Sequence, residues 1–143
     1  MSVETRAITG EAELADALEL RRSVFCEEQG VPEHEEFTDQ DSQAQHLVAI
    51  ADGEVLGTCR LLFDRDTVQL GRLAVDPRAR HRGIATGLLA HAERLARATG
   101  AQRIVLDAQT QALELYIASG YRELGQRFLE VGIEHMRMEK SLA

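Results

Sequence analysis

The feature that most constrains the fold is an apolar run, then a short loop, then a strongly periodic helix and a second apolar run. The two runs are residues 70–75 and 103–107. Between them, apolar residues recur at helical spacing, namely Ile84, Leu88, Leu89, Ala92, Leu95 and Ala96. Gly100 stands where a left-handed cap ends a helix. A strand, a helix and a strand in this order predict a crossover unit with two parallel strands.

The remaining segments predict a mixed α/β sheet with flanking helices. Asp52-Gly53 tolerates the positive φ angles of a type I′ turn, so the apolar segments on either side are expected to form a hairpin. The expected strands are residues 3–9, 46–51, 54–63, 67–75, 103–107, 121–130 and 133–139, and the expected helices are residues 11–26, 83–99 and 111–119. We therefore expect one domain, residues 1–143, with about seven strands.

Composition narrows the class of partner and the compartment. The formal net charge is −8, which argues against a nucleic-acid backbone as the ligand, because binding it needs an extended basic face. No apolar run approaches the length of a membrane span, and residues 1–6 lack the pattern of an export signal. Two cysteines are too few for a disulfide framework. The expected location is the cytoplasm, with no membrane partner.

The loop before the central helix predicts an anion site. It reads Arg80-His81-Arg82-Gly83-Ile84-Ala85, and a helix start leaves backbone N–H groups unpaired. Gly83 and Ala85 lack side chains that would hold an anion away. From residue 72 to 82 there are four arginines and one aspartate, a local charge of +3. A basic spot on an acidic protein indicates a specific anionic ligand.

An acidic segment has two interpretations. Residues 27–41 contain seven carboxylates and neither lysine nor arginine. The segment is either a solvated loop with a short helical turn or an acidic lip that attracts cationic substrates through its field. The sequence leaves both open.

Three motifs in order resemble the GNAT superfamily of N-acetyltransferases. The loop fits the family's acyl-CoA pattern Q/R-x-x-G-x-G/A, the strand before it reads Leu70-x-x-Leu73-x-Val75-x-Pro77, and Ala112-x-x-Leu115-Tyr116-x-x-x-Gly120-Tyr121 follows. Val24-Phe25-x-x-Glu28-Gln29 and Gly132-Ile133-Glu134-His135-Met136 look like the ElaA-like branch of small acetyltransferases.

No metal is expected, because the five histidines and two cysteines form no cluster with ligand spacing. The resemblance implies an acetyltransferase that moves the acetyl group of acetyl-CoA to a primary amine by direct attack in a ternary complex. In that fold two parallel strands splay, here residues 70–75 and 103–107, and the cofactor enters between them. The implied cofactor-binding residues are Leu73, Ala74 and Val75 for the pantetheine arm, Arg80, His81, Arg82, Gly83, Ile84, Ala85 and Thr86 for the pyrophosphate, and Gln109, where the family often has asparagine.

The resemblance also gives Tyr116 the role of general acid toward the departing thiolate. A thiol pKa near ~8.5 against a tyrosine near ~10 makes full transfer uphill by roughly 2 kcal/mol, so hydrogen bonding with late transfer is the expected description. The alternative is an interior tyrosine that donates to a carbonyl. The oxyanion donor is expected to be a backbone N–H near Ala74 or Val75.

The general base stays open. Many relatives place a glutamate at the position of Gly71, and this chain lacks it. Substitutes that spacing does not rank are Glu28, Glu36, His46, Asp107 and His135. Cys26 and Cys59 lie among apolar residues, so core packing is favoured over nucleophilic catalysis.

Two rival functions stay open as well. One is a CoA-binding sensor or interaction module without turnover, suggested by Gly71 and Gln109. The other is an acyltransferase for longer acyl chains, suggested by Arg22-x-Val24-Phe25, which resembles acyl-homoserine lactone synthases. The amine acceptor, cationic if the acidic lip steers it, would be shaped by residues 27–45 and 128–135. The terminal strands are a candidate homodimer contact.

Overall fold

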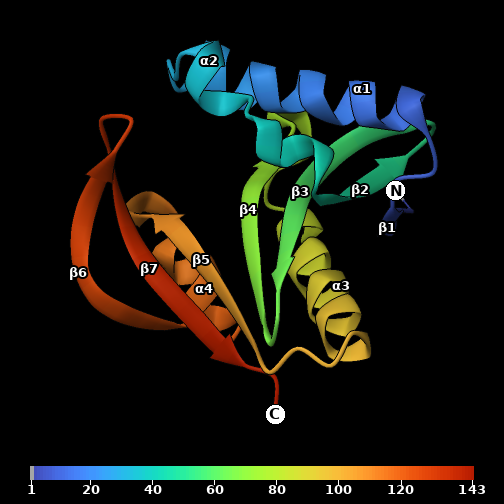
Figure 1. Cartoon of the computed structure of the whole chain (residues 1–143). Helices are drawn as coiled ribbons and strands as arrows, with labels where there is room; N and C mark the ends of the chain where they lie inside the picture. Colours follow the sequence, from blue (N-terminus) through green and yellow to red (C-terminus); the bar gives the residue numbers. More distant parts are fainter. Residues whose placement is uncertain (1) are drawn as a thin grey trace.

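A single seven-stranded sheet organises the computed structural model, which describes residues 2–143. The strand order is β1-β2-β3-β4-β5-β7-β6, and β4 and β5 are the parallel pair (Figure 1). The strands are β1 (Glu4–Ala7), β2 (Gln45–Ala51), β3 (Glu54–Asp64), β4 (Thr67–Val75), β5 (Arg103–Gln109), β6 (Arg122–Glu130) and β7 (Ile133–Ser141). The predicted mixed α/β sheet is confirmed.

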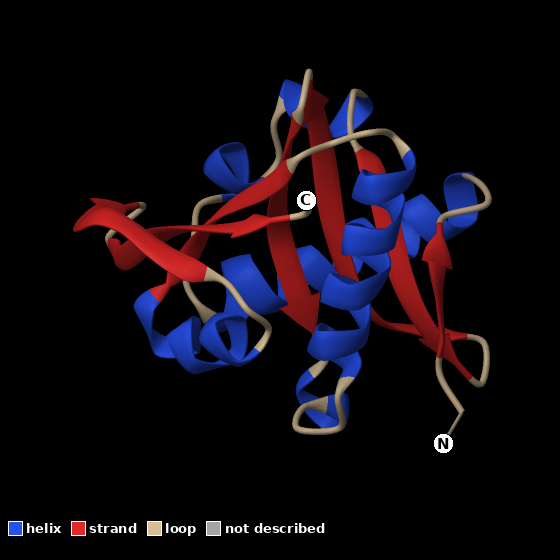
Figure 2. Ribbon diagram, turned by 90° about the horizontal axis from the view of Figure 1, so that it is seen from below, coloured by secondary structure: helices blue, strands red, loops and turns tan. Residues whose placement is uncertain are grey.

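Helices cover both faces of this sheet (Figures 1 and 2). On one face lie α1 (Glu11–Arg21), its π-helical continuation η1 (Arg22–Glu28) and α2 (Glu33–Glu36), followed by the short 3-10 turn η2 (Asp39–Ser42). On the other lie α3 (Ile84–Ala98) and α4 (Leu113–Ala118). The 3-10 turns η3 (Pro77–Ala79) and η4 (Thr110–Ala112) precede these two helices. None of the helices within residues 2–143 is long and apolar enough to cross a bilayer.

The parallel strands β4 and β5 separate part-way along their length. Their pairing runs from Thr67 opposite Arg103 to Gln69 opposite Val105 and stops there. Beyond Gln69 the two strands diverge, and Figure 1 shows the sheet opened into a V between them. The predicted splay is therefore present, and it leaves one side of residues 70–75 without a strand neighbour.

The main core holds α3 against the sheet. Leu88, Leu89, Ala92 and Ala96 are buried on the face that the periodicity predicted. Gly57 on β3 sets how closely this helix approaches. A Cβ atom there would lie 2.6 Å from Cγ2 of Ile84 and 3.1 Å from Cδ1 of Leu88. Because Gly57 has no side chain, the first turn of α3 can pack directly against β3.

One sequence prediction about the elements is corrected, and one is confirmed. The first helix does not continue as a regular α-helix to residue 26: α1 ends at Arg21, and a π-helix carries the chain on to Glu28. The last two strands do pair, but β7 lies between β5 and β6, so the sheet edges are β1 and β6. Of the two terminal strands of the chain, only β1 is a free edge.

Candidate functional site

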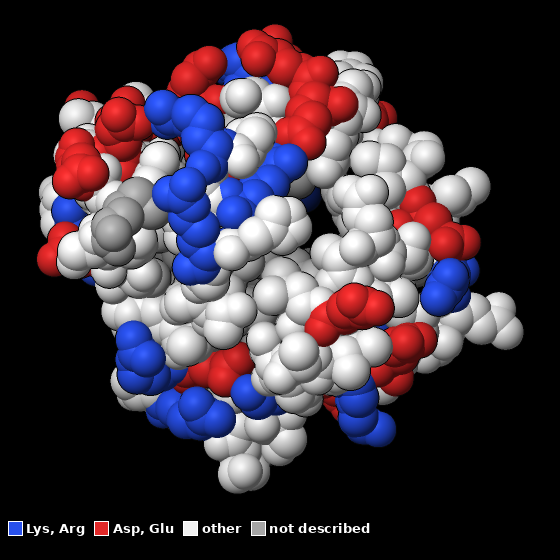
Figure 3. Space-filling model, turned by 180° about the vertical axis from the view of Figure 1, so that it is seen from behind, with Lys and Arg blue, Asp and Glu red and all other residues white. Residues whose placement is uncertain are grey.

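A cavity of about 980 Å³ occupies the splay between β4 and β5. Its lining includes residues of β3, β4, the loop before α3, the end of β5, η1, α2, α4 and β7. Figure 3 shows the molecule from behind, where a hollow opens beside a group of basic side chains. The structure thus brings most of the predicted site residues to one space: Leu73, Ala74, Val75, Arg80, His81, Gly83, Ile84, Ala85, Thr86, Gln109 and Tyr116. Arg82 is exposed and outside this lining.

The loop before α3 presents backbone N–H groups to the cavity. Gly83 is the N-cap residue, with a left-handed φ of 83° and no side chain to cap the helix. The first intrahelical bond runs from the Gly87 N–H to the Gly83 carbonyl, at 3.0 Å. The N–H groups of Ile84, Ala85 and Thr86 therefore have no intrahelical acceptor. This arrangement suits an anion.

The predicted basic spot around this loop is largely neutralised. Arg78 pairs with Asp76 and Glu54, at 3.0 and 2.8 Å. Arg80 binds both carboxylate oxygens of Glu28, at 2.7 and 2.8 Å, and its Nε donates to the Val75 carbonyl. The charge count over residues 72–82 did not include Glu54 and Glu28. These two carboxylates come from β3 and η1, which are far from the loop in sequence.

Tyr116 reaches the same cavity from α4. The side chain is buried, and its hydroxyl makes no hydrogen bond to any residue in the described part of the chain. Burial raises the pKa of the Tyr116 phenol. Tyr121 packs edge-on against it, with ring centroids 6.0 Å apart, and donates its own hydroxyl to Glu93 at 3.2 Å. Tyr121 is thus the hydrogen-bonded interior tyrosine, whereas Tyr116 keeps a free hydroxyl at the cavity.

Gln109 forms a bridge across the cavity. Its Nε2 donates to Oε1 of Gln29 at 2.8 Å, and Nε2 of Gln29 donates back at 3.2 Å. Nε2 of Gln111 also donates to Gln109. The bridge joins the end of η1 to the end of β5. A cofactor contact by Gln109 would therefore compete with this amide pair.

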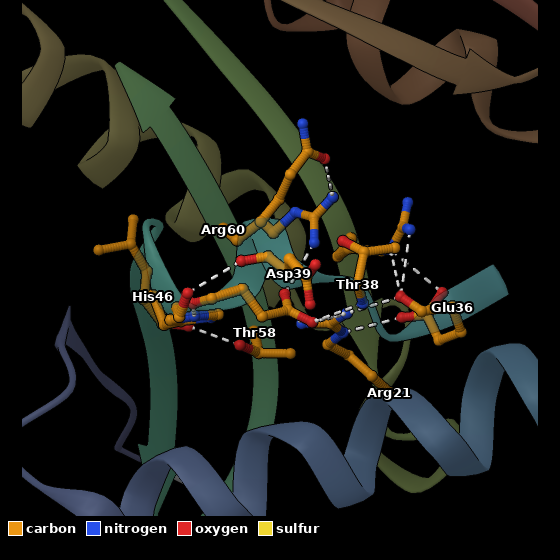
Figure 4. Close-up of polar contacts among 12 residues, drawn as sticks. Arg21, Glu36, Thr38, Asp39, His46, Thr58 and Arg60 are labelled. Atoms are coloured by element: carbon orange, nitrogen blue, oxygen red, sulfur yellow. Dashed lines mark hydrogen bonds and ion pairs between the residues drawn. The ribbon is translucent and has the colours of Figure 1, made fainter. Parts of the chain in front are cut away.

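Residues of the acidic segment are held by arginines from other elements, an arrangement that neither interpretation of the sequence anticipated. Glu36 accepts from Nε of Arg21 at 2.8 Å and lies 3.1 Å from Nε of Arg72. Asp41 accepts from Arg21 at 2.8 Å and from Arg60 at 2.7 Å. Figure 4 shows Arg21 reaching from α1 toward Glu36, with Arg60 on β3. We call these five residues the arginine cluster.

Four of the seven carboxylates in this segment form ion pairs. Glu36 and Asp41 belong to the arginine cluster, Glu28 pairs with Arg80, and Glu33 pairs with Arg22. The segment is therefore neither a plain solvated loop nor an uncompensated acidic lip. The sequence did carry one signal of this arrangement. Arg60 interrupts the apolar run Cys59-Arg60-Leu61-Leu62, and a charge in a buried strand needs a partner.

The structure also distinguishes the candidate bases. Hydrogen bonds from Arg80 lower the pKa of Glu28, and Glu36 is held by two arginines. His46 bonds the Asp41 carbonyl through Nε2 and does not line the cavity. Asp107 lines it but pairs with Arg137 at 3.3 Å.

His135 differs from these four. It lines the cavity, and its Nδ1 lies 2.7 Å from the Ile133 carbonyl. A carbonyl only accepts, so Nδ1 carries the proton and the neutral ring leaves Nε2 as an acceptor. Within residues 2–143, Nε2 of His135 has no hydrogen-bond partner.

The cysteines occupy packing positions. Cys59 is buried in the main core, and burial raises its pKa to about 12. Cys26 is partly buried, and its pKa is also raised, chiefly by burial. A raised thiol pKa disfavours the nucleophilic thiolate.

Comparison with known proteins places the chain in a family. The profile of the acetyltransferase (GNAT) domain matches residues 9–142, almost the whole chain. The chain belongs to the GNAT acetyltransferases. The N-acetyltransferase YjcF of Bacillus subtilis is 34% identical over 131 residues, covering 91% of this chain and 94% of YjcF. The protein YyaT of the same organism is 34% identical over 141 residues, covering 96% and 95%. This GNAT protein is thus an acyltransferase.

Solved structures agree on the GNAT fold. A Lactobacillus plantarum protein described as a candidate N-acetyltransferase superimposes with a TM-score of 0.91 at 27% identity, covering 100% of both chains. Escherichia coli ElaA gives 0.81 at 20% identity, covering 97% of this chain and 99% of ElaA. An aminoglycoside 6′-N-acetyltransferase complexed with coenzyme A gives 0.75 at 15% identity, covering 100% and 98%. The last two likenesses show the fold alone.

Proposed function

We propose that this protein transfers the acetyl group of acetyl-CoA to a primary amine, by direct attack in a ternary complex. The observation that carries the proposal is a single cavity, in the splay of β4 and β5, that has an unpaired helix N-terminus at one position and the free hydroxyl of Tyr116 at another. In acetyl-CoA, a diphosphate and a thioester lie on one flexible arm. The diphosphate would bind the helix N-terminus, and the thioester would lie at the Tyr116 hydroxyl.

The cofactor would bind along the open side of β4. Beyond Gln69 this strand has no neighbour on the β5 side, so the backbone groups of Leu73, Ala74 and Val75 that point to this side would pair with pantetheine amides. The Val75 carbonyl also accepts from Nε of Arg80. The pyrophosphate would lie on the N–H groups of residues 80–86. The aminoglycoside acetyltransferase that shares the fold was solved in complex with coenzyme A, which supports coenzyme A as a ligand of this fold.

Tyr116 would act as the acid and His135 as the base. Because burial keeps the Tyr116 phenol protonated, it can donate a hydrogen bond to the thiolate as the carbon–sulfur bond breaks. Nε2 of His135 would accept a proton from the ammonium group of the acceptor, which leaves a neutral amine. The amine nitrogen then bonds to the thioester carbon. As the carbon–sulfur bond breaks, the nitrogen loses its second proton to solvent, and the thiolate takes up a proton from Tyr116, which regains one from solvent after CoA is released.

A bulge in β4 would supply the oxyanion donor. Thr58 pairs with Ala74 and Arg60 with Gly71, so two residues of β4 oppose one of β3, and Arg72 takes a left-handed φ of 54°. A bulge re-aims backbone groups next to it. We assign the oxyanion contact to the N–H of Ala74 or Val75.

The proposal predicts that the purified protein releases CoA thiol from acetyl-CoA in the presence of a primary amine, with one acetyl group gained by the amine. Mass spectrometry of the product and a thiol assay measure both. Tight binding of acetyl-CoA without transfer to any of a broad amine panel would favour the sensor function instead. Faster transfer from longer acyl-CoA than from acetyl-CoA would favour the long-chain acyltransferase.

The cytoplasm is the proposed compartment, since Cys26 and Cys59 are both free thiols. A homodimer, if formed, would use a sheet edge, and β6 is the edge that exposes apolar side chains, Phe128 and Leu129.

A further inference from the structure

We infer that the amine acceptor carries a carboxylate, and that Arg60 and Arg72 bind it at the floor of the cavity. This inference rests on the proposed function and adds the substrate class. It replaces the expectation of a purely cationic acceptor with an acceptor that has an amino group at one end and an anionic group at the other.

The first observation is the charge balance of the arginine cluster. Three guanidinium groups share two carboxylates, which leaves +1. Arg21 is the central member, bound to both Glu36 and Asp41, and its side chain is only 1% exposed. The excess charge therefore falls on the two outer members. An uncompensated charge taken out of water is costly unless a ligand of opposite sign completes it.

The second observation is that the outer members line the cavity with unused donors. Arg72 donates to the Glu36 carbonyl through Nε and to backbone carbonyls of residues 35 and 36 through Nη2. Its Nη1 has no hydrogen-bond acceptor in the part of the chain that the structure describes, and 26% of its side chain is exposed. Arg60 uses Nη1 and Nη2 for Asp41 and Gln40, which leaves Nε.

The third observation is the space beside these donors. Gly71 stands opposite Arg60 in the β3–β4 register and directly before Arg72. A Cβ atom at Gly71 would meet no atom within 4 Å, so the cavity is open there. The left-handed φ of 54° at Arg72 is uncommon for a residue with a side chain. Backbone strain of this kind clusters at binding and active sites.

The carboxylates nearby do not supply the missing charge. Glu35 and Glu130 also line the cavity, but both are exposed, and Arg72 binds the backbone carbonyl of Glu35. The cavity carboxylates Glu28 and Asp107 are paired with Arg80 and Arg137. Solvent screens an exposed charge far more than a buried one. The carboxylate of the acceptor would thus be the ionic partner of Arg60 and Arg72 at the floor of the cavity.

Pairs of amines that differ only in this charge test the inference. The probes are glycine, β-alanine and γ-aminobutyrate, each beside its amide, titrated by calorimetry into the protein saturated with CoA. We expect at least one acid to bind about tenfold more tightly than its amide, since charge-assisted hydrogen bonds are roughly twice as strong as neutral ones. Equal affinity within all three pairs would overturn the inference.

Turnover of the same pairs separates this inference from the proposed function. If the amides are acetylated as fast as the acids, transfer stands and the anion subsite fails. If the acids bind more tightly but none is acetylated, the subsite stands and transfer to these amines fails. The comparison uses the wild-type protein, so it does not depend on a variant that folds.

A pair of variants assigns the effect to Arg72. Arg72→Asn removes the guanidinium and keeps a residue that tolerates a left-handed φ. The preference for acid over amide should fall to about threefold or less. Arg97→Asn removes the same charge from the exposed last turn of α3 and should leave the preference unchanged. An unchanged preference in Arg72→Asn would exclude Arg72 from the subsite.

Discussion

The wall of the cavity formed by residues 80–86 and the wall formed by α1 and α2 are built in different ways. The first is local: one glycine, one helix start and their own backbone N–H groups make it. The second is assembled by side chains from α1, α2, η2, β3 and β4, which meet in the arginine cluster. Under the proposed function, the local wall would bind the acetyl-CoA that every reaction uses, whereas the assembled wall would bind the acceptor.

Breaking the assembled wall at its centre should give the largest loss of stability. Arg21→Met removes the guanidinium that Glu36 and Asp41 share, and we expect the free energy of unfolding to fall by about 3 kcal/mol or more. The matched control is Arg22→Met, one residue on, whose pairs with Glu19 and Glu33 are exposed and should contribute far less to stability. Urea denaturation of both measures the difference. Equal losses would mean that the cluster is no more than surface pairing.

The local wall should be sensitive to the seating of α3. Gly57→Ala places a methyl group against Ile84 and should cost about 1–3 kcal/mol and weaken acetyl-CoA binding by shifting the first turn of the helix. Gly71→Ala is the control for stability, because its methyl group meets open space and should change the unfolding free energy by less than about 0.5 kcal/mol. If both substitutions lower the free energy of unfolding equally, the close approach of α3 to β3 does not determine the position of the loop.

Acid should weaken the assembled wall through Asp41. Hydrogen bonds and charges from Arg21 and Arg60 outweigh its burial and lower its pKa from 3.8 to about 2. Because the folded-state pKa is depressed, this stabilisation is present above pH 3.8 and is lost as the pH falls toward 2, up to about 2 kcal/mol in all.

The pH dependence of unfolding for Asp41→Asn should lack that acid step, while Asp39→Asn, an exposed neighbour, should keep it. Burial raises the pKa of Glu36, so its contribution has the opposite sign and lies at higher pH. An acid step of the same size in Asp41→Asn and the wild type would assign it to other carboxylates.

The same contrast explains what the sequence could predict. The crossover unit and the helix start at Gly83 follow from periodicity and from a glycine at a helix start, which are properties of neighbouring residues. The splay was expected from the resemblance to the GNAT family. The motif that places Tyr116 is local as well. The ion pairs could not be predicted, since Arg21 and Arg72 are far apart in sequence and many arginines face the same acidic segment. The fold selects among them.

Two further features of the fold could not be read from the sequence, for the same reason. The change from α1 to the π-helix η1 leaves the apolar pattern of Val24 and Phe25 intact, so periodicity does not signal it. The position of β7 between β5 and β6 depends on which strand pairs with β5. The residues of the β6–β7 hairpin do not themselves indicate which of its two strands lies next to β5.

The most direct test of the account compares two tyrosines. Tyr116→Phe should lower kcat for thiol release by about 10²-fold or more, the usual contribution of a general acid, with the acetyl-CoA dissociation constant unchanged. Tyr121→Phe removes a hydroxyl that donates to Glu93 and should lower stability while kcat stays near the wild-type value. A kcat for Tyr116→Phe equal to that of Tyr121→Phe would contradict the claim that the phenol at the cavity takes part in the transfer.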